Sequence, residues 1–207
     1  MRHVFLETNW LVALAAPART VPPAARELLD AAKLGSTRIY VPACCIREAK
    51  KTILGGRFHP KEAGRLRDYI RWAVEQKRLD EKTAESARMM LSRFEEHVRA
   101  GLAGLNETLR TITTSAGVEI VRLDDAMLDL SLELHFGEIE LSEFDRAVLA
   151  VVLIKGRSLR ESGETDVNFC GLDSDLWPWE KQPRQGAELK KLYDDAGVRV
   201  YAGFTLT

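Results

Sequence analysis

The chain has 207 residues, of which 45% are hydrophobic and 29% charged, and its formal net charge is −1. These values predict one soluble domain, spanning 1–207, and no apolar run approaches the roughly 20 residues that cross a bilayer, so we expect a cytoplasmic protein with no membrane partner. The three cysteines, Cys44, Cys45 and Cys170, have the spacing of neither a disulfide framework nor a zinc site.

The first quarter of the chain alternates strand and helix patterns. The expected elements are a buried strand at 3–6, a helix at 10–14 capped by Thr8 or Asn9 and ended by Pro17, a helix from Pro23 to Gly35, a strand at 38–41, and a helix from Pro42 to the Gly55-Gly56 break. Two strand-then-helix units in succession predict a parallel sheet.

A long helical stretch interrupts this alternation. From Pro60 to about Thr114 the apolar spacing is helical, with a break near Leu79-Asp80 and weak points at Gly101 and Gly104. We interpret it as an inserted helical hairpin at about 57–115.

The α/β pattern then resumes. We expect a strand at 118–121, helices at 124–135 and 142–155, a strand at 167–172, a helix at 187–196 and an edge strand at 198–201.

Acidic residues follow the strands of this pattern. Glu7 comes directly after the first strand, Glu48 lies in the helix after the second, Asp145 is in the first turn of its helix, and Asp173 and Asp175 follow the strand that ends near position 172. Ligands of open parallel sheets collect at the carboxyl ends of the strands, so these side chains could meet there. Clustered carboxylates repel one another, and a divalent cation stabilises them, which indicates a metal-dependent hydrolase.

Charge is unevenly distributed along the chain. Between Arg47 and Arg78 there are ten Lys or Arg against four Asp or Glu, whereas between Glu119 and Asp145 nine acids stand against Arg122 alone. A basic flank beside an acidic centre suits an anionic polymer as substrate. A solvated, salt-bridged helix face explains the basic run equally well.

Four short motifs, in this order and in these settings, resemble those of the PIN-domain nucleases. They are Phe5-Leu6-Glu7-Thr8-Asn9, Val41-Pro42 leading to Glu48, Leu141-Ser142 leading to Asp145, and Gly171-Leu172-Asp173-Ser174-Asp175. The resemblance implies a PIN-like α/β/α sandwich with a central, mostly parallel sheet; the helical insertion has no counterpart in it.

The resemblance also implies an activity, which is hydrolysis of phosphodiester bonds in single-stranded RNA with Mg²⁺ or Mn²⁺. Glu7, Asp145 and Asp173 would be metal ligands, with Glu48 and Asp175 completing or orienting the shell, and a metal-bound water would attack phosphorus. Candidates for substrate contacts are Thr8, Asn9, Lys50, Lys51 and Arg57. A toxin restrained by an antitoxin is one form of this activity, and a homodimer is an expected assembly.

Position 7 departs from the family pattern, which has Asp where this chain has Glu. The additional methylene moves the carboxylate by more than an ångström, and a displacement of about 1 Å can cost about 100-fold in rate. An alternative function is therefore a catalytically weak PIN-like module that binds RNA or a protein.

Each acid also has a structural interpretation. Asp145 fits a capping box with Ser142, Glu48 can pair with Lys51, and Asp173 and Asp175 can be turn residues. Glu7 is the hardest to explain this way, since an acid directly behind a core strand needs a partner. Close to the last acids, Trp177-Pro178-Trp179 could stack on unpaired bases or pack in the core.

Overall fold

The computed structural model describes residues 1–17, 20–55, 60–135, 139–179 and 183–206. At its centre is a five-stranded, all-parallel sheet of order β3-β2-β1-β4-β5. The strands are β1 (Arg2–Leu6), β2 (Thr37–Pro42), β3 (Val118–Val121), β4 (Val167–Gly171) and β5 (Arg199–Ala202). The expectation of an α/β fold with a parallel sheet and an edge strand at the end of the chain is confirmed.

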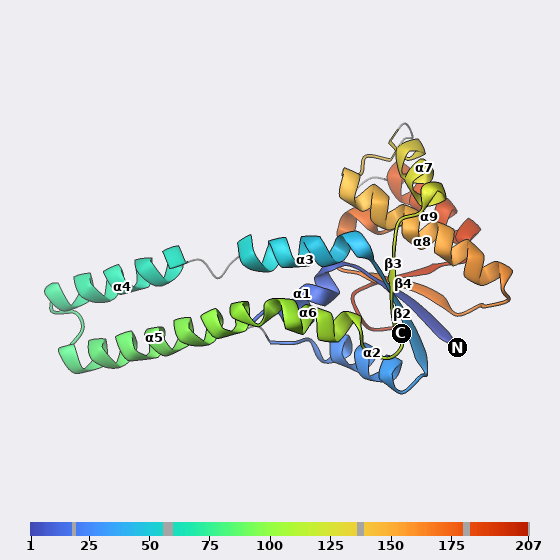
Figure 1. The fold of residues 1–207 in the computed structure, drawn as a ribbon. Coiled ribbons are helices and arrows are strands. Elements are labelled where there is room, and N and C mark those ends of the chain that lie inside the picture. Colours follow the sequence, from blue (N-terminus) through green and yellow to red (C-terminus); the bar gives the residue numbers. More distant parts are fainter. Residues whose placement is uncertain (18–19, 56–59, 136–138, 180–182, 207) are drawn as a thin grey trace.

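Most helices flank this sheet, and two extend away from it (Figure 1). The helices are α1 (Thr8–Ala15), α2 (Pro23–Lys33), α3 (Ala43–Gly55), α4 (Pro60–Glu75), α5 (Glu81–Ala103), α6 (Leu105–Thr113), α7 (Asp125–Glu133), α8 (Glu143–Glu161) and α9 (Pro183–Ala196), with a short 3₁₀ turn, η1 (Ser174–Leu176). Helices α1, α2 and α6 lie on one side of the sheet and α8 and α9 on the other (Figure 1). No described helix is long and apolar enough to cross a membrane.

The core forms where apolar strands meet these helices. β1 and β4 are central in the sheet and are covered on both faces, so their residues form nearly continuous apolar runs. Phe5, Phe169 and Leu149 are among the largest fully buried side chains. Trp10 is also fully buried, and its indole N–H donates to the Ala25 carbonyl oxygen at 3.0 Å, which ties α1 to α2.

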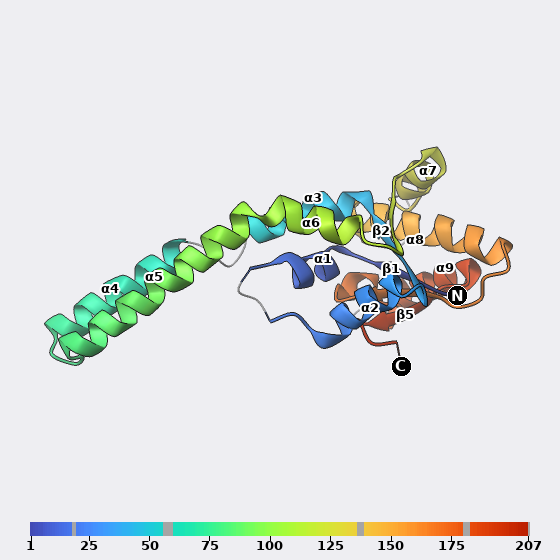
Figure 2. The same cartoon turned by 60° about the horizontal axis from the view of Figure 1, so that its bottom comes forward.

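Helices α4 and α5 form an antiparallel pair that extends away from the sheet (Figures 1 and 2). We call this pair the arm. The turn between them falls where the sequence breaks, and Asp80 caps α5 by accepting from the Thr83 amide at 2.9 Å. Helix α5 continues through Gly101, where a Cβ would lie 2.4 Å from the Pro17 Cβ, and ends at Gly104. Gly101 therefore allows α5 to pass close to the chain that leaves α1.

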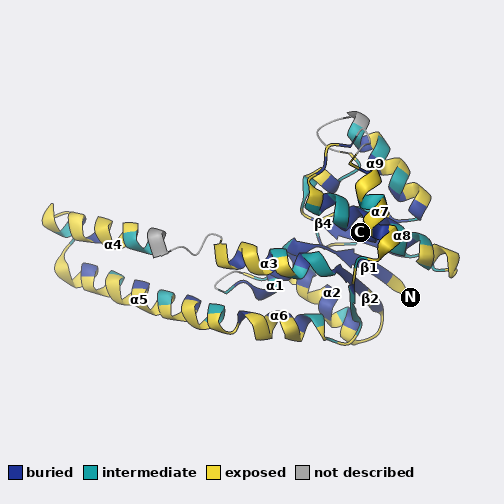
Figure 3. Ribbon diagram, turned by 45° about the horizontal axis from the view of Figure 1, so that its top comes forward, coloured by how far each residue is buried: buried dark blue, intermediate teal, exposed yellow. Residues whose placement is uncertain are grey.

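Much of the arm is exposed to solvent (Figure 3). Its buried apolar side chains, Ile70, Ala73, Ala84, Leu91 and Val98, form a narrow seam that is not part of the core cluster defined by the described residues.

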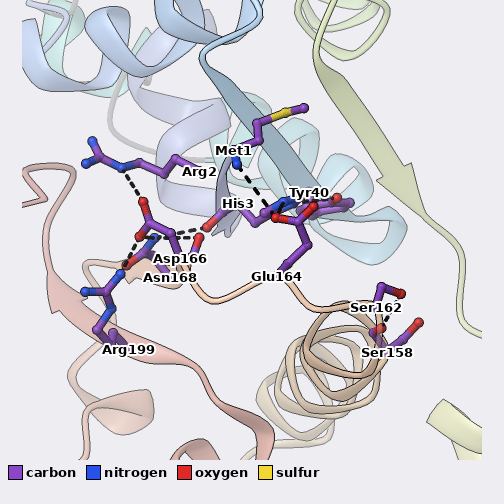
Figure 4. A network of polar contacts seen from close by, with 10 residues as sticks. All are labelled: Met1, Arg2, His3, Tyr40, Ser158, Ser162, Glu164, Asp166, Asn168 and Arg199. Atoms are coloured by element: carbon purple, nitrogen blue, oxygen red, sulfur yellow. Dashed lines mark hydrogen bonds and ion pairs between the residues drawn. The ribbon is translucent and has the colours of Figure 1, made fainter.

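Ion pairs hold the amino-terminal edge of the sheet together (Figure 4). Asp166, just before β4, accepts from Arg2 of β1 and from Arg199 of β5. The buried His3 ring lies between the Tyr40 hydroxyl, 3.0 Å from Nδ1, and a Glu164 oxygen, 3.1 Å from Nε2. These contacts join β1 to β2, to β5 and to the segment that enters β4, at the edge opposite the acidic residues.

The ends of three helices differ from those expected from the sequence. Pro42 pairs with Val121 as the last residue of β2 and does not open α3. Neither Thr8 nor Asn9 caps α1, because Glu7 is the residue at the cap position and its side chain turns elsewhere. Helix α8 runs six residues beyond the expected 155, to Glu161.

Candidate active site

Three acids from separate parts of the chain lie at the carboxyl edge of β1 and β4. Glu7 follows β1, Asp173 follows β4, and Asp145 is in the first turn of α8. Because β1 and β4 are hydrogen-bonded neighbours, the two segments that follow them emerge side by side. We call this group of residues, with Asp175, the acidic edge.

Glu7 is only 2% exposed, and its carboxylate is held by the chain that leaves β4. Oε1 accepts from the backbone amides of Leu172 at 2.8 Å and Asp173 at 3.1 Å, and from the Asn9 side chain at 3.2 Å. The glutamate found at position 7, where the PIN-domain pattern has aspartate, thus has a structural role, because its longer side chain reaches the segment that follows the neighbouring strand.

Gly171 makes room for that carboxylate. A Cβ at this position would lie 2.7 Å from Glu7 Oε1, which is closer than atoms of this kind approach one another. Its lack of a side chain, and not an unusual backbone conformation, is what the site requires.

Asp145 is 8% exposed and is fixed by the residue that caps its helix. The Ser142 hydroxyl accepts from the Asp145 amide at 3.1 Å and donates to Asp145 Oδ2 at 2.5 Å. The capping interaction expected from the sequence is therefore present, and it leaves the second carboxylate oxygen to face other groups.

Asp173 caps the 3₁₀ turn η1, and its Oδ1 accepts from the Asp175 amide at 3.0 Å. The interpretation of this pair as turn residues is correct in that sense. It does not remove them from the acidic edge, because their charges act on the other two acids.

The electrostatics couple the four acids through Asp173. Burial raises the pKa of Glu7; hydrogen bonds from Asn9 and from the backbone amides of Asp173 and Leu172 oppose this shift, and the charge of Asp173 adds to it. Burial also raises the pKa of Asp145, against the Ser142 hydrogen bond, and the charges of Asp173 and Asp175 raise it further. A bound cation would reverse the direction of these shifts.

No family model, no curated protein and no solved structure matches this chain.

The acidic edge fits a divalent cation in the chemistry of its donors. All are carboxylate oxygens, the ligands that Mg²⁺ and Mn²⁺ prefer. Within the described residues, however, no group of three or more His, Cys, Asp or Glu side chains is arranged to hold a metal ion. Glu7 Oε1 already accepts three hydrogen bonds, so its other oxygen, Oε2, is the atom that remains for a cation.

The other candidate residues are less closely associated with the acidic edge. Glu48 accepts from Lys51 at 3.3 Å on the surface of α3, and neither a hydrogen bond nor an ion pair joins it to the acidic edge in the described part of the chain. Lys50 is exposed, and Arg57 lies outside the described residues. The Thr8 side chain is buried and interacts with the Cys45 thiol.

Some basic residues of the arm pair with acids, and Arg78 contacts an aromatic ring. Arg67 pairs with Glu95, Arg71 lies 3.7 Å from Asp68, and the Arg78 guanidinium lies 5.0 Å from the centre of the Trp72 ring. These pairs are consistent with the salt-bridged helix face that the charge distribution left open, and each reduces the positive potential available to an anionic polymer.

Sequence reasoning did not identify Gly171 or Tyr193 as parts of this site. Burial, and secondarily the charge of Glu7, raise the pKa of the Tyr193 hydroxyl, which donates to the Leu176 carbonyl oxygen at 3.1 Å. This contact ties α9 to η1 and so supports the segment that carries Asp173. A glycine at the end of a buried strand, two residues before an Asp, was the signal available for Gly171.

Proposed function

We propose that the protein is a PIN-like, Mg²⁺- or Mn²⁺-dependent ribonuclease that hydrolyses phosphodiester bonds of single-stranded RNA. The observation that carries the proposal is the placement of Glu7, Asp145 and Asp173 together at the carboxyl edge of two central parallel strands, with Glu7 and Asp145 buried. Ligand sites of such sheets form at this edge. The strand order and the four motifs are consistent with the PIN-like interpretation.

In this proposal Glu7 Oε2, Asp145 and Asp173 hold the cation, and Asp175 contributes from the adjacent turn. A bound divalent cation supplies an activated water and neutralises charge on the phosphoryl oxygens. The chain itself keeps the ligands in place, because Asn9 and two backbone amides hold Glu7, and Ser142 holds Asp145. Burial of Glu7 and Asp145 excludes water from competing with these contacts.

The test is cleavage of labelled single-stranded RNA by purified protein with Mn²⁺. We expect Asp145→Asn and Asp173→Asn each to lower the rate at least about 100-fold, as loss of one ligand does for a precisely held site. Asp30→Asn, on the exposed face of α2, is the matched control and should leave the rate unchanged. Activity that survives both ligand substitutions, or that persists in EDTA, would exclude the proposal.

A readout independent of activity is metal-linked stability. A cation that binds only the folded state raises the melting temperature, by mass action. We expect Mn²⁺ to raise it for the wild type and for Asp30→Asn, and to have little effect on Asp145→Asn. An equal shift in all three proteins would place the metal elsewhere.

One observation favours the alternative, an RNA- or protein-binding module of low activity. Glu7 Oε1 is fully used by three N–H donors, and no three acids of the described chain stand at ligand spacing. This alternative predicts binding of RNA or a protein partner that persists in EDTA, with no cleavage under any metal. The same cleavage and melting experiments distinguish the two functions.

A further inference from the structure

Next to the acidic edge, two tryptophan rings lie against each other. The rings of Trp177 and Trp179 have centroids 6.1 Å apart and planes inclined by 21°. Trp177 is half-buried, whereas Trp179 is 54% exposed. A single exposed aromatic ring is ordinary, but one that lies on a second ring beside a cluster of acids is a candidate contact surface.

The pair is held by the same chain segment that holds Glu7. The Trp177 indole N–H donates to the Gly171 carbonyl oxygen at 3.1 Å, and the next two backbone amides, of Leu172 and Asp173, donate to Glu7. One short stretch of chain therefore fixes both the aromatic pair and the buried carboxylate.

Helix α9 fixes the other side of the pair. Its backbone approaches Pro178 so closely that a Cβ on Gly186 would lie 3.0 Å from the Pro178 carbonyl oxygen. Trp177 is anchored to Gly171 and Pro178 lies against α9, so the backbone that leads to Trp179 is held on both sides, and the Trp179 ring lies on that of Trp177.

We propose that Trp179, supported by Trp177, is a stacking platform for one unpaired nucleobase of the single-stranded RNA whose backbone reaches the acidic edge. The choice of RNA as occupant rests on the proposed function. The nature of the contact rests on the structure, since an exposed indole face supported by a second ring can stack on any of the four bases. A base in a duplex has both faces covered by its neighbours, so the platform selects unpaired nucleotides.

Stacking requires no metal, so it can be measured separately from cleavage. The probe is a fluorescein-labelled, single-stranded eight-nucleotide RNA, titrated in EDTA at about 0.15 M ionic strength, which screens repulsion between its phosphates and the acidic edge, and followed by fluorescence anisotropy. We expect Trp179→Ala to weaken binding at least about fivefold, the lower end of what one stacked base contributes. Trp179→Phe should retain most of the affinity.

The matched control is Trp72→Ala. Trp72 is similarly exposed, at 40%, but it lies on the arm against Arg78, and its truncation should leave the affinity unchanged. A second probe of the same length and charge, made only of abasic nucleotides, should bind wild type and Trp179→Ala equally. A duplex of the same sequence should also fail to distinguish the two proteins.

The outcomes separate this inference from the proposed function, with cleavage in Mn²⁺ measured in parallel. If the wild type cleaves RNA but Trp179→Ala binds it as tightly as the wild type, the platform is excluded and the nuclease stands; the pair would then be a protein contact. If the affinity falls as expected while no protein cleaves, the platform stands and the nuclease is excluded. If the wild type binds no RNA in EDTA, the platform is overturned.

Discussion

At the scale of single residues, the structure explains the glutamate at position 7. Its carboxylate lies beside Gly171 and accepts from two backbone amides of the segment after β4. An aspartate is one methylene shorter and would not extend as far from β1. Glu7 and Gly171 therefore form a matched pair, in which the absence of a side chain at one position makes room for the longer side chain at the other.

This pairing predicts that Gly171→Ala is damaging only when Glu7 is present. The new Cβ would displace a buried carboxylate from three donors, and leaving such groups unsatisfied costs about 1–3 kcal/mol. In a Glu7→Ala background the obstacle is gone, and the same substitution should cost little. Urea unfolding of the four proteins in EDTA measures the coupling. Additive effects of the two substitutions would show that the residues act independently.

The buried charge of Glu7 also predicts a pH dependence in metal-free protein. Because the pKa of Glu7 is raised in the folded state, the folded chain binds more protons than the unfolded chain above the ordinary pKa of about 4.3. The free energy of unfolding therefore falls as pH rises from that value to the folded pKa. Glu7→Gln lacks this titration, while its amide oxygen can still accept from the backbone amides.

Across that window, we expect the stability of Glu7→Gln relative to wild type to increase with pH and then level off. Urea titrations at pH 4, 5, 6, 7 and 8 in EDTA measure it. A difference between the two proteins that stays constant over the series would show that Glu7 is not perturbed by folding.

At the scale of elements, helix α8 runs along one face of the sheet, from the acidic edge to the edge where β5 begins. Its first turn holds Asp145, and its later part packs against the segment that enters β5. At Gly156 a Cβ would lie 2.6 Å from Val198 Cγ2 and 3.4 Å from the Ala196 carbonyl oxygen. Close packing, and not flexibility, explains a glycine in the middle of a buried helix.

Two opposing effects therefore act on Gly156→Ala. Alanine gains about 1 kcal/mol of helix propensity, whereas overpacking a tight contact costs about 1–3 kcal/mol. We expect net destabilisation, measured as a lower melting temperature. Gly64→Ala, in α4 with nothing within 4 Å of the new Cβ, has the propensity term alone and should increase helix content. Val198→Ala should relieve the cost at Gly156; if it does not, the contact is not the cause.

Elements whose signals are local could be predicted from the sequence. The strand at 118–121 has the predicted bounds, and the cap of Ser142 on Asp145 was visible in four consecutive residues. The hydrogen-bond partners of Glu7 could not be predicted, because they depend on β1 and β4 being neighbours, which brings together residues 165 positions apart. The packing of α8 on β4 and η1 brings Asp145 toward Asp173, so a sequence can propose the acidic edge but not its distances.

At the scale of the whole molecule, two separate apolar units hold the protein together. The core cluster joins the sheet to its flanking helices, while the arm depends on the narrow seam between α4 and α5. In the described chain, α4 packs mainly on α5, and the arm projects from the body (Figure 2). Stability need not be uniform in such a molecule, since segments with few buried apolar contacts open independently.

We expect the amides of α4 to exchange with solvent faster than those of β1 and β4, because opening the arm exposes little of the core. Ile70→Ala removes a seam residue that is 4% exposed, and truncation of a buried isoleucine costs about 2–5 kcal/mol. It should accelerate exchange in α4 and along α5 but leave the strands protected. Leu149→Ala, in the core, should lower protection throughout the body, including β1 and β4.

Hydrogen exchange followed by mass spectrometry measures both variants against wild type. Loss of protection in the strands of Ile70→Ala would mean that the arm and the body unfold as one unit. If the arm opens alone, its orientation can change without disturbing Glu7 or Asp145, because both are held by contacts within the body. The arm could then engage a partner while the acidic edge keeps its geometry.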